Sequence, residues 1–482
     1  MRKHTKRRFS ILLVLVLMAA YIPLAITASA EAVLVDSGSC GGGLSWEFYD
    51  DGNLTITGTG IMPNWTTSAP APWYDYHSII ETVNLPSGII IVGNCAFYNC
   101  ESLKSIAIPE GIWAIGHAAF YHCSSLKSIT FSDDTYLIGD SAFAGCSSLE
   151  KIDIPYGAYG IGTQTFINCT ALESVTIPNS VKYIDEAAFY QCNSLKNITI
   201  PNNVNTIGDR AFWRCDSLES IIIPESVTSI GAHAFASCAS LKDLTINGNI
   251  TSLGNYVFAY CRALKNLTIG DGVTIIGDSM FYECNSLENV TIGSGVKSIG
   301  DGGAFYNCTS LKNIEIPCNI TSIGRGAFVS CTSLLSATIP CSVTSIGLNL
   351  FSLCDKVTVY GYTGSYIEEY LADYDVPFVA LDPAACGHIW KAADCTAAKT
   401  CLVCGTVEGA ALGHIASDWI ILREADINGA GYKYIRCTVC GAVLEEELTP
   451  ALPPVEPPVI SFWQRIVDFF NMIINFFRNL FS

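Results

Sequence analysis

The hydrophobic and polar positions of this chain repeat with a period of 23 residues. A phenylalanine marks each period, a cysteine follows it by three residues, and a leucine, or a valine in the last copy, comes three residues later. One step is 24 residues long, where Gly302 and Gly303 accommodate an insertion. The phenylalanines are Phe97, Phe120, Phe143, Phe166, Phe189, Phe212, Phe235, Phe258, Phe281, Phe305, Phe328 and Phe351. A fixed period of this length is the sequence signature of stacked repeats.

One unit predicts a strand, a turn and a return segment. Leu195, Ile198 and Ile200 are separated by polar residues, which indicates a strand with one buried face. Pro201 ends that strand because it has no N–H to donate to a neighbouring strand. The return segment passes through Gly208, where we expect a turn with a positive φ.

Stacking gives each unit a place to bury its apolar side. A single coil of 23 residues cannot bury that side, whereas stacked coils bury one another's. The pattern therefore predicts a mainly β solenoid of about twelve 23-residue coils. Neighbouring strands of such an array lie about 4.8 Å apart.

The unit resembles the BspA-like class of leucine-rich repeat. Residues 207–229 read I-G-x-x-A-F-x-x-C-x-S-L-x-x-I-x-I-P-x-x-V-x-x, and the resemblance covers about residues 79–360. Residues 31–78, with Cys40, Trp46 and the run Gly-Asn-Leu-Thr-Ile-Thr-Gly-Thr-Gly at 52–60, are similar to the β N-terminal cap of that family. The resemblance implies a protein of the bacterial or protozoan surface that adheres to host or matrix proteins, although a fold alone does not give a function.

The outward positions of the predicted strands carry hydroxyl and amide side chains in one coil after another. Such a flat polar face suits a broad protein or glycan surface, whereas a small molecule needs a deep pocket. We therefore expect partners among extracellular proteins or glycoproteins. The predicted binding face comprises Thr176, Asn197, Thr199, Thr245, Asn266, Thr268, Asn289 and Thr291.

The 22 cysteines fall into groups with different expectations. Twelve follow the repeat, from Cys100 to Cys354, and we expect them to be small buried hydrophobic residues with unreactive thiols. Cys318 and Cys341 follow the prolines of adjacent coils, where a coil spacing of about 4.8 Å lies within the Cα range of a disulfide. We predict that this pair is bridged in an exported protein. A pairing of Cys40 and Cys95 stays open.

The region 381–448 carries two C-x-x-C-G motifs and resembles small Cys/His modules of bacterial surface proteins. Two thiolates two residues apart can chelate one zinc ion, and glycine allows the turn between them. Two zinc-ribbon-like ligand sets compete with each other and with disulfides, so zinc is a candidate cofactor without being assigned. The candidate ligands are His388, Cys401, Cys404 and His414, or Cys401, Cys404, Cys437 and Cys440.

The N-terminus and the charge restrict where the protein works and what it binds. Residues 1–30 have basic residues, an apolar run and Ala28-Ser29-Ala30, which predicts a cleaved signal peptide and a secreted or cell-surface protein. The net charge of −18 disfavours nucleic acid as a partner. Recognisable nucleophile elbows and phosphate loops are missing from the sequence, so we do not expect an enzyme.

The C-terminal residues predict a linker and an amphipathic helix. Prolines make 449–460 a semi-rigid linker. Within 461–482, polar residues recur every three or four positions beside Phe, Ile and Trp, as on a helix with one polar stripe. This helix could bind a membrane interface, self-associate or dock on the protein itself. The sequence thus favours an adhesin or protein-binding scaffold, with a structural envelope spacer and a secreted hydrolase as alternatives.

Overall fold

The computed structural model describes residues 32–381 and the backbone of six strands between residues 390 and 449. The predicted signal peptide, the proline-rich linker and the C-terminal helix lie outside the described residues. The side chains of the candidate zinc ligands also lie outside them, so zinc and disulfides both remain open in the Cys/His module.

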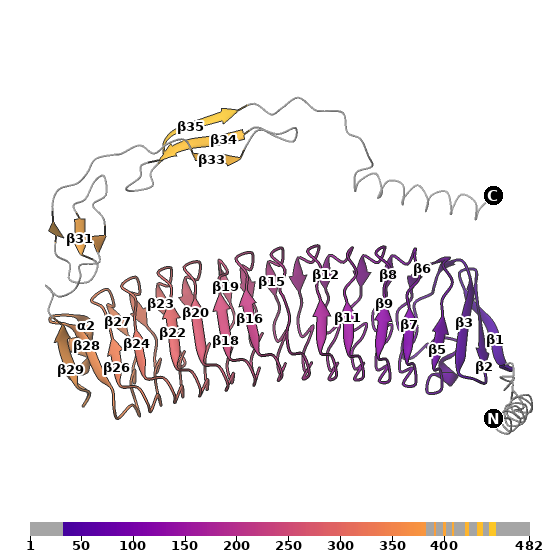
Figure 1. Ribbon diagram of the computed structural model, residues 1–482, viewed down its shortest axis with the longest axis horizontal. Coiled ribbons are helices and arrows are strands. Elements are labelled where there is room, and N and C mark those ends of the chain that lie inside the picture. The colour runs from indigo at the N-terminus through magenta and orange to yellow at the C-terminus, as the bar shows by residue number, and fades with distance from the viewer. Residues whose placement is uncertain are drawn as a thin grey trace, which may run out of the picture. The chain divides into compact units, whose positions relative to one another are not determined.

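The N-terminal cap is an antiparallel meander that continues directly into the repeats. β1 (Leu34–Gly41), β2 (Leu44–Tyr49) and β3 (Asn53–Gly58) pair in order, and β3 then pairs in parallel with β5 (Thr82–Asn84). β4 (Gly60–Ile61) pairs in parallel with β6 (Ile89–Val92), and η1 (Tyr74–Tyr76) lies between the two pairs. β3 and β4 therefore form a coil ahead of the twelve phenylalanine-marked repeats (Figure 1).

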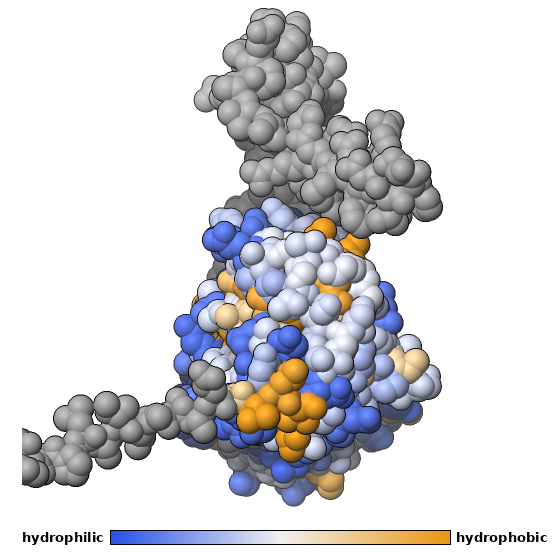
Figure 2. Space-filling view, turned by 90° about the vertical axis from the view of Figure 1, so that its right-hand side faces the viewer, coloured by the Kyte–Doolittle hydropathy of each residue, from blue (hydrophilic) through white to orange (hydrophobic). Residues whose placement is uncertain are grey.

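The cap closes one end of the hydrophobic core. Trp73 is 1% exposed, and its ring stacks on Phe97 of the first repeat at a centroid distance of 5.8 Å. Its Nε1 donates a hydrogen bond of 2.8 Å to the backbone oxygen of Ala96. Figure 2 looks onto this end and shows a mostly polar surface with an apolar patch. The exposed apolar residues of the edge strand region include Val33, Leu34 and Val35.

Each coil has three sides. The first side is the longer of its two strands, and these longer strands pair in parallel so that each residue lies beside its equivalent in the next coil. Ile221 faces Leu244, and Leu244 faces Leu267, so equivalent residues of adjacent coils lie side by side (Figure 1). These strands are β7 (Ser105–Ala107), β9 (Ser128–Thr130), β11 (Lys151–Asp153), β13 (Ser174–Thr176), β16 (Ser220–Ile223), β18 (Asp243–Ile246), β20 (Asn266–Ile269), β22 (Asn289–Ile292), β24 (Asn313–Glu315) and β26 (Ser336–Thr338). The coil between β13 and β16 joins this side through a bridge from Ser174 to Asn197.

The second side of each coil is a two-residue strand with the same parallel register. Ile184 pairs with Ile207, and Ile207 pairs with Ile230. These strands are β8 (Ala114–Ile115), β10 (Leu137–Ile138), β12 (Gly160–Ile161), β14 (Tyr183–Ile184), β15 (Thr206–Ile207), β17 (Ser229–Ile230), β19 (Ser252–Leu253), β21 (Ile275–Ile276), β23 (Ser298–Ile299), β25 (Ser322–Ile323) and β27 (Ser345–Ile346).

The third side is an arc, which we define as the five residues from two before to two after each repeat phenylalanine. In the arc of Phe235, the backbone N–H groups of His233, Phe235 and Ser237 donate to carbonyls of the next coil at 2.8–3.0 Å. His233 and Ser237 have φ values of 57° and 60°. Two left-handed residues per arc thus turn the chain and still satisfy its backbone groups across coils.

The expected positive φ at Gly208 is wrong. The left-handed positions belong to the arc, and non-glycine residues such as Arg210 and Arg214 occupy them with φ values of 55° and 60°. Gly208 instead lies against the previous coil, where an added Cβ would come within 2.5 Å of the backbone nitrogen of Glu186. Close approach of two backbones explains this glycine.

The core confirms the columns that the repeat predicts. Adjacent repeat phenylalanines stack with centroid distances from 4.9 Å for Phe212 and Phe235 to 5.8 Å for Phe328 and Phe351. The twelve repeat cysteines are buried, as expected. Eleven of these thiols donate to the carbonyl of the phenylalanine 26 or 27 residues earlier, at Sγ–O distances of 3.0–3.4 Å. Burial raises the pKa of the Cys169 thiol to about 12, which keeps it unreactive.

The C-terminal elements depart from the repeat. β28 (Thr358–Tyr362), α2 (Tyr366–Leu371) and β29 (Phe378–Leu381) follow the last repeat phenylalanine, and α2 buries Ile367 and Leu371. Two three-stranded antiparallel sheets lie in 390–449. They consist of β30 (Trp390–Lys391), β31 (Lys399–Cys401) and β32 (Val407–Glu408), and of β33 (Ile420–Arg423), β34 (Gly431–Arg436) and β35 (Val443–Thr449). Within the described residues, no helix is long and apolar enough to cross a membrane.

Candidate functional site

The outward face of the longer strands, here called the strand side, is the surface on which the predicted binding residues lie. Alternation places them there, because β16 exposes Ser220 and Ile222 while it buries Ile221 and Ile223. Of the eight predicted residues, seven are exposed and Thr245 is half-buried. Thr245, Thr268 and Thr291 pair in register across β18, β20 and β22. The structure therefore brings this part of the predicted face together as one continuous column.

A ladder of hydrogen bonds orders the amide column of the strand side. The Nδ2 of Asn266 donates to the Oδ1 of Asp243 at 2.7 Å, and the Nδ2 of Asn289 donates to the Oδ1 of Asn266 at 2.8 Å. Each bond joins side chains of adjacent coils. The ladder fixes the side chains of three coils and leaves them facing solvent, so a partner would meet an ordered polar surface.

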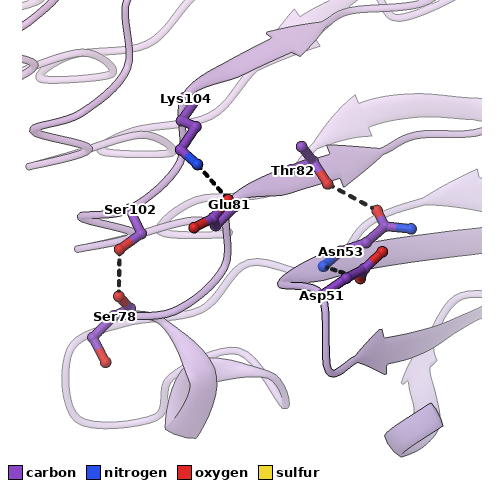
Figure 3. Close-up of polar contacts among 7 residues, drawn as sticks. All are labelled: Asp51, Asn53, Ser78, Glu81, Thr82, Ser102 and Lys104. Atoms are coloured by element: carbon purple, nitrogen blue, oxygen red, sulfur yellow. Dashed lines mark hydrogen bonds and ion pairs between the residues drawn. The ribbon is translucent and has the colours of Figure 1, made fainter. Parts of the chain in front are cut away.

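A separate group of side-chain hydrogen bonds of the same kind joins the cap to the next coil, and the sequence did not reveal it. The Oδ1 of Asn53 accepts hydrogen bonds from the Oγ1 of Thr82 at 3.1 Å and from the Nδ2 of Asn84 at 2.9 Å. Figure 3 shows Asn53 facing Thr82, with Asp51 accepting the Asn53 backbone N–H at 3.0 Å. Asn53 lies before the first repeat, so the 23-residue period could not align it with the other outward positions.

Lysine and glutamate residues border the ladders and pair across coils. Lys196 and Glu173 approach to 3.0 Å, as do Lys242 and Glu219, and Figure 3 shows Lys104 directed at Glu81. These pairs are more than two-fifths exposed, so each stabilises the fold weakly. Their pairing leaves this part of the strand side with charges of both signs, in contrast to the acidic chain as a whole.

A shallow depression of about 480 Å³ interrupts the strand side around the ends of β11 and β13. Its lining includes Thr176 of the predicted face, together with Asp153, Asn179 and Tyr156. Tyr156 is 70% exposed, which is unusual for so large a ring. A hydrogen bond from Thr176 and the nearby Lys151 amine hold the pKa of Asp153 below its ordinary value. A charged carboxylate and an exposed ring therefore flank this depression.

A second depression of about 340 Å³ surrounds an apolar residue in the outward column. Asn197, Thr199, Ser220 and Ile222 line it, and the first two belong to the predicted face. Ile222 occupies the position where Thr199 stands in the preceding coil, and it is 63% exposed. The predictions missed Ile222 and Tyr156, although a break in the outward threonine column was a signal for Ile222.

The remaining candidate sites are metal-binding clusters and the cysteines outside the repeat column, and only some of them lie in the part of the chain that the structure describes. Among the described residues, no cluster of three or more His, Cys, Asp or Glu side chains could hold a metal ion. Cys40 and Cys95 are unbridged thiols, and burial raises the pKa of each. Cys318 and Cys341 are each partly buried, and their disulfide stays a prediction that intact-mass analysis after alkylation would check.

Comparisons with known proteins agree with this architecture. The family described as BspA type Leucine rich repeat region (6 copies) matches residues 72–192, 160–272 and 228–358, which together make up more than half of the chain. No curated protein matches the chain.

Solved structures also resemble the chain. A leucine-rich repeat protein from Bacteroides ovatus is 27% identical, with a TM-score of 0.55 over 73% of this chain and 100% of that one. A leucine-rich repeat protein from Eubacterium ventriosum is 25% identical, with a TM-score of 0.44 over 67% and 95%. A leucine rich cell surface protein from Faecalibacterium prausnitzii is 26% identical, with a TM-score of 0.37 over 70% and 97%.

Proposed function

The chain belongs to the BspA-type leucine-rich repeat family, and from this premise we propose that it is a cell-surface or secreted protein whose strand side binds other proteins. The finer proposal is adhesion to host or matrix glycoproteins, with a binding role and no catalytic one. The predicted signal peptide at 1–30 supports export, and the ordered polar surface supports recognition of a macromolecule.

The observation that carries this proposal is an exposed apolar side chain set among polar side chains of the strand side. Ile222 is 63% exposed within a depression lined by Asn197 and Thr199. Binding energy in protein interfaces concentrates on a few well-packed side chains surrounded by polar contacts that exclude water. A flat surface with shallow depressions can also supply the roughly 800 Å² per partner that stable interfaces bury.

The test compares two substitutions of exposed aliphatic residues in the full chain. Ile222→Asp introduces a negative charge in the depression of the strand side. The control, Leu137→Asp, introduces the same charge at a 48% exposed residue of β10, one of the two-residue strands on the second side of the coils. Binding is measured to immobilised fibronectin, collagen and mucin. We expect Ile222→Asp to weaken binding by about tenfold or more, which corresponds to about 1.4 kcal/mol.

The control variant should bind as the wild type does, and both variants should melt at the wild-type temperature. Equal loss in both variants would point to a general effect of charge, and unchanged binding by Ile222→Asp would remove the strand side from the interface. Failure of the wild type to bind any of the three glycoproteins would overturn the adhesion proposal.

A further inference from the structure

The second side of the coils, formed by the two-residue strands, departs from the repeat at one place. Serine occupies the first position of β17, β19, β23, β25 and β27. β12 and β14 instead place Gly160 beside Tyr183 in the paired register. Among the short strands that the structure describes, Tyr183 is the only aromatic residue at this position. Because serine suffices in so many coils, the stacking of the coils does not require a ring here.

The ring of Tyr183 lies flat over the backbone of Gly160. A Cβ at Gly160 would come within 2.2 Å of Tyr183 Cζ and 2.5 Å of both Cε atoms, so it would point into the face of the ring. A glycine within a strand often marks such a close approach. Gly160 therefore covers one face of the ring, and the opposite face is turned to solvent. The half-buried state of Tyr183 agrees with one covered face.

A second ring stands beside this open face. Tyr159 is 63% exposed, its ring centroid lies 5.9 Å from that of Tyr183, and the two ring planes meet at 71°. The two rings form the base and one side of a depression of about 390 Å³. This volume is near the lower end of those that hold small ligands. We call the two rings, together with the polar residues that line their depression, the tyrosine corner.

The polar side chains of the tyrosine corner keep free donors and a free acceptor. These side chains are Lys182, Asp185, Asn205 and Thr206. The Oγ1 of Thr206 donates to the Oδ1 of Asn205 at 3.0 Å, and the Oδ1 of Asp185 accepts the backbone N–H of Glu186 at 2.8 Å. Within the described residues, the Lys182 amine, the Asn205 Nδ2 and the second Asp185 oxygen have no hydrogen-bond partner.

The charges around the tyrosine corner favour an uncharged ligand. In its lining, the charges of Lys182 and Asp185 offset each other. Burial, and then the carboxylates of Asp185 and Asp140, raise the pKa of Tyr183, so its phenol stays protonated and can donate as well as accept a hydrogen bond. The two carboxylates disfavour an anionic ligand, and the lining amine of Lys182 disfavours a cationic one.

We propose that the tyrosine corner binds one ring of a neutral oligosaccharide. The flat C–H face of a pyranose packs on the open face of Tyr183, because the electron-rich face of an aromatic ring attracts weakly positive C–H groups. The hydroxyl groups around the sugar both donate and accept hydrogen bonds, which matches the free groups of Lys182, Asn205 and Asp185. A purely apolar ligand would bury those polar groups without partners, which costs free energy.

A peptide suits this place less well than a sugar does. Extended peptides commonly bind by adding a strand to an open sheet edge. β14 has no open edge, because it pairs with β12 on one side and with β15 on the other. The inference goes beyond the proposed function, because it uses a different side of the coil and a different class of ligand.

The test measures binding of the full chain to four neutral tetrasaccharides, which are cellotetraose, mannotetraose, chitotetraose and lacto-N-tetraose. Calorimetric titration gives the affinity, and saturation-transfer NMR shows which sugar protons contact the protein. Sialyllactose is the anionic probe, choline the cationic probe and a glycine–serine–leucine pentapeptide the peptide probe. We expect at least one neutral tetrasaccharide to bind more tightly than these three probes, and Tyr183→Ser to weaken that binding by about tenfold or more.

The repeat itself supplies substitutions that the fold accepts. Tyr183→Ser introduces the residue found at this position of β17, and Tyr159→Thr introduces the residue found at Thr228, so both variants should fold and bind more weakly. Gly160→Ser keeps every lining side chain but places a Cβ against the Tyr183 ring, so it should displace the ring and weaken binding. Ile275→Ser changes a 39% exposed residue at the first position of β21 and should leave binding unchanged.

The outcomes decide between the ligands. Absence of binding to all four neutral tetrasaccharides, or binding unaffected by Tyr183→Ser and Gly160→Ser, would overturn the proposal. Tighter binding of sialyllactose, choline or the peptide, lost on Tyr183→Ser, would overturn it in favour of that ligand. Ile222→Asp should leave oligosaccharide binding intact, so failure of this inference and failure of strand-side adhesion are distinguishable.

Discussion

The strand side and the arc side cover the same core but present different chemistry to solvent. On the strand side, extended backbone alternates buried aliphatic residues with exposed amides and hydroxyls, such as Asn266 and Thr268. On the arc side, two left-handed residues flank each phenylalanine, and rings and arginines such as Trp213 and Arg214 face outward. One sequence period therefore builds two surfaces of different chemistry.

The difference also concerns how neighbouring coils are held together. On the strand side, backbone hydrogen bonds between paired strands join adjacent coils. The arc side also has backbone hydrogen bonds between coils, and in addition it has the stacked phenylalanines and the thiol-to-carbonyl hydrogen bonds. Coil-to-coil contacts supply most of the stability of a solenoid. The arc side should therefore contain the substitutions with the largest effects on unfolding, and the exposed strand side those with small effects.

The largest expected effect is that of Phe235→Ala. Its ring is fully buried and lies 4.9 Å from Phe212 and 5.2 Å from Phe258. Truncation leaves a cavity between two rings, so we expect a loss of about 3–5 kcal/mol in the free energy of unfolding of this region. Chemical denaturation followed by circular dichroism measures it. A loss below that of exposed Ile222→Ala, expected within about 0.5 kcal/mol, would contradict the stacked core.

The sequence predicts the outward residues of the strand side but not those of the arc side, and the reason is the backbone conformation of each side. Period-two alternation places Thr268 and Asn289 outward on strands, so the strand side followed from the sequence. In the arc the left-handed turns break any simple periodicity, so nothing in the sequence shows that the rings of His233 and Tyr256 stack. Asn53 was missed because it precedes the first 23-residue repeat. The positive φ predicted for Gly208 is wrong because this glycine is needed where its backbone lies close to the backbone of the preceding coil, and one repeat read alone does not show that contact.

The second effect concerns the cysteine column. The thiol of Cys238 is buried and donates to the carbonyl oxygen of Phe212 at 3.4 Å. Cys238→Ala removes that donor and a sulfur-sized volume, and we expect a loss of about 1 kcal/mol in the free energy of unfolding. Cys95→Ala, at a half-buried cysteine outside the column, is the control. Equal losses at both sites would show that the thiol hydrogen bond between coils does not contribute.

The third effect tests the strand side. Asn266 connects Asp243 and Asn289, so Asn266→Ala breaks two hydrogen bonds between exposed side chains. Water replaces the lost partners, so we expect a loss of only about 0.5 kcal/mol in the free energy of unfolding. Thr268→Ala, on the same strand, should change this free energy less. A loss as large as that of Cys238→Ala would mean that the polar ladders hold the coils together as strongly as the arc does.

The smallest effect is a pH dependence that belongs to the arc side. Burial, and then the nearby Arg210 charge, lower the pKa of His233, and Asp209 opposes the shift. The ordinary histidine pKa is about 6.5, so the unfolded chain takes up a proton at this residue more readily than the folded chain does. His233 therefore adds stability above pH about 6.5, and that contribution is lost as pH falls through the ordinary pKa toward the lowered one.

Melting temperatures of the wild type and His233→Gln between pH 7.5 and pH 5 measure this contribution. We expect the wild type to lose more stability over that interval than the variant, because the variant has no proton to take up at this position. The longer strands of the repeats contain no histidine, so the difference would come from the arc side alone. Parallel curves for the two proteins would show that His233 titrates equally in both states. The arc side would then be open enough to solvent to admit a charged imidazole between Trp213 and Tyr256.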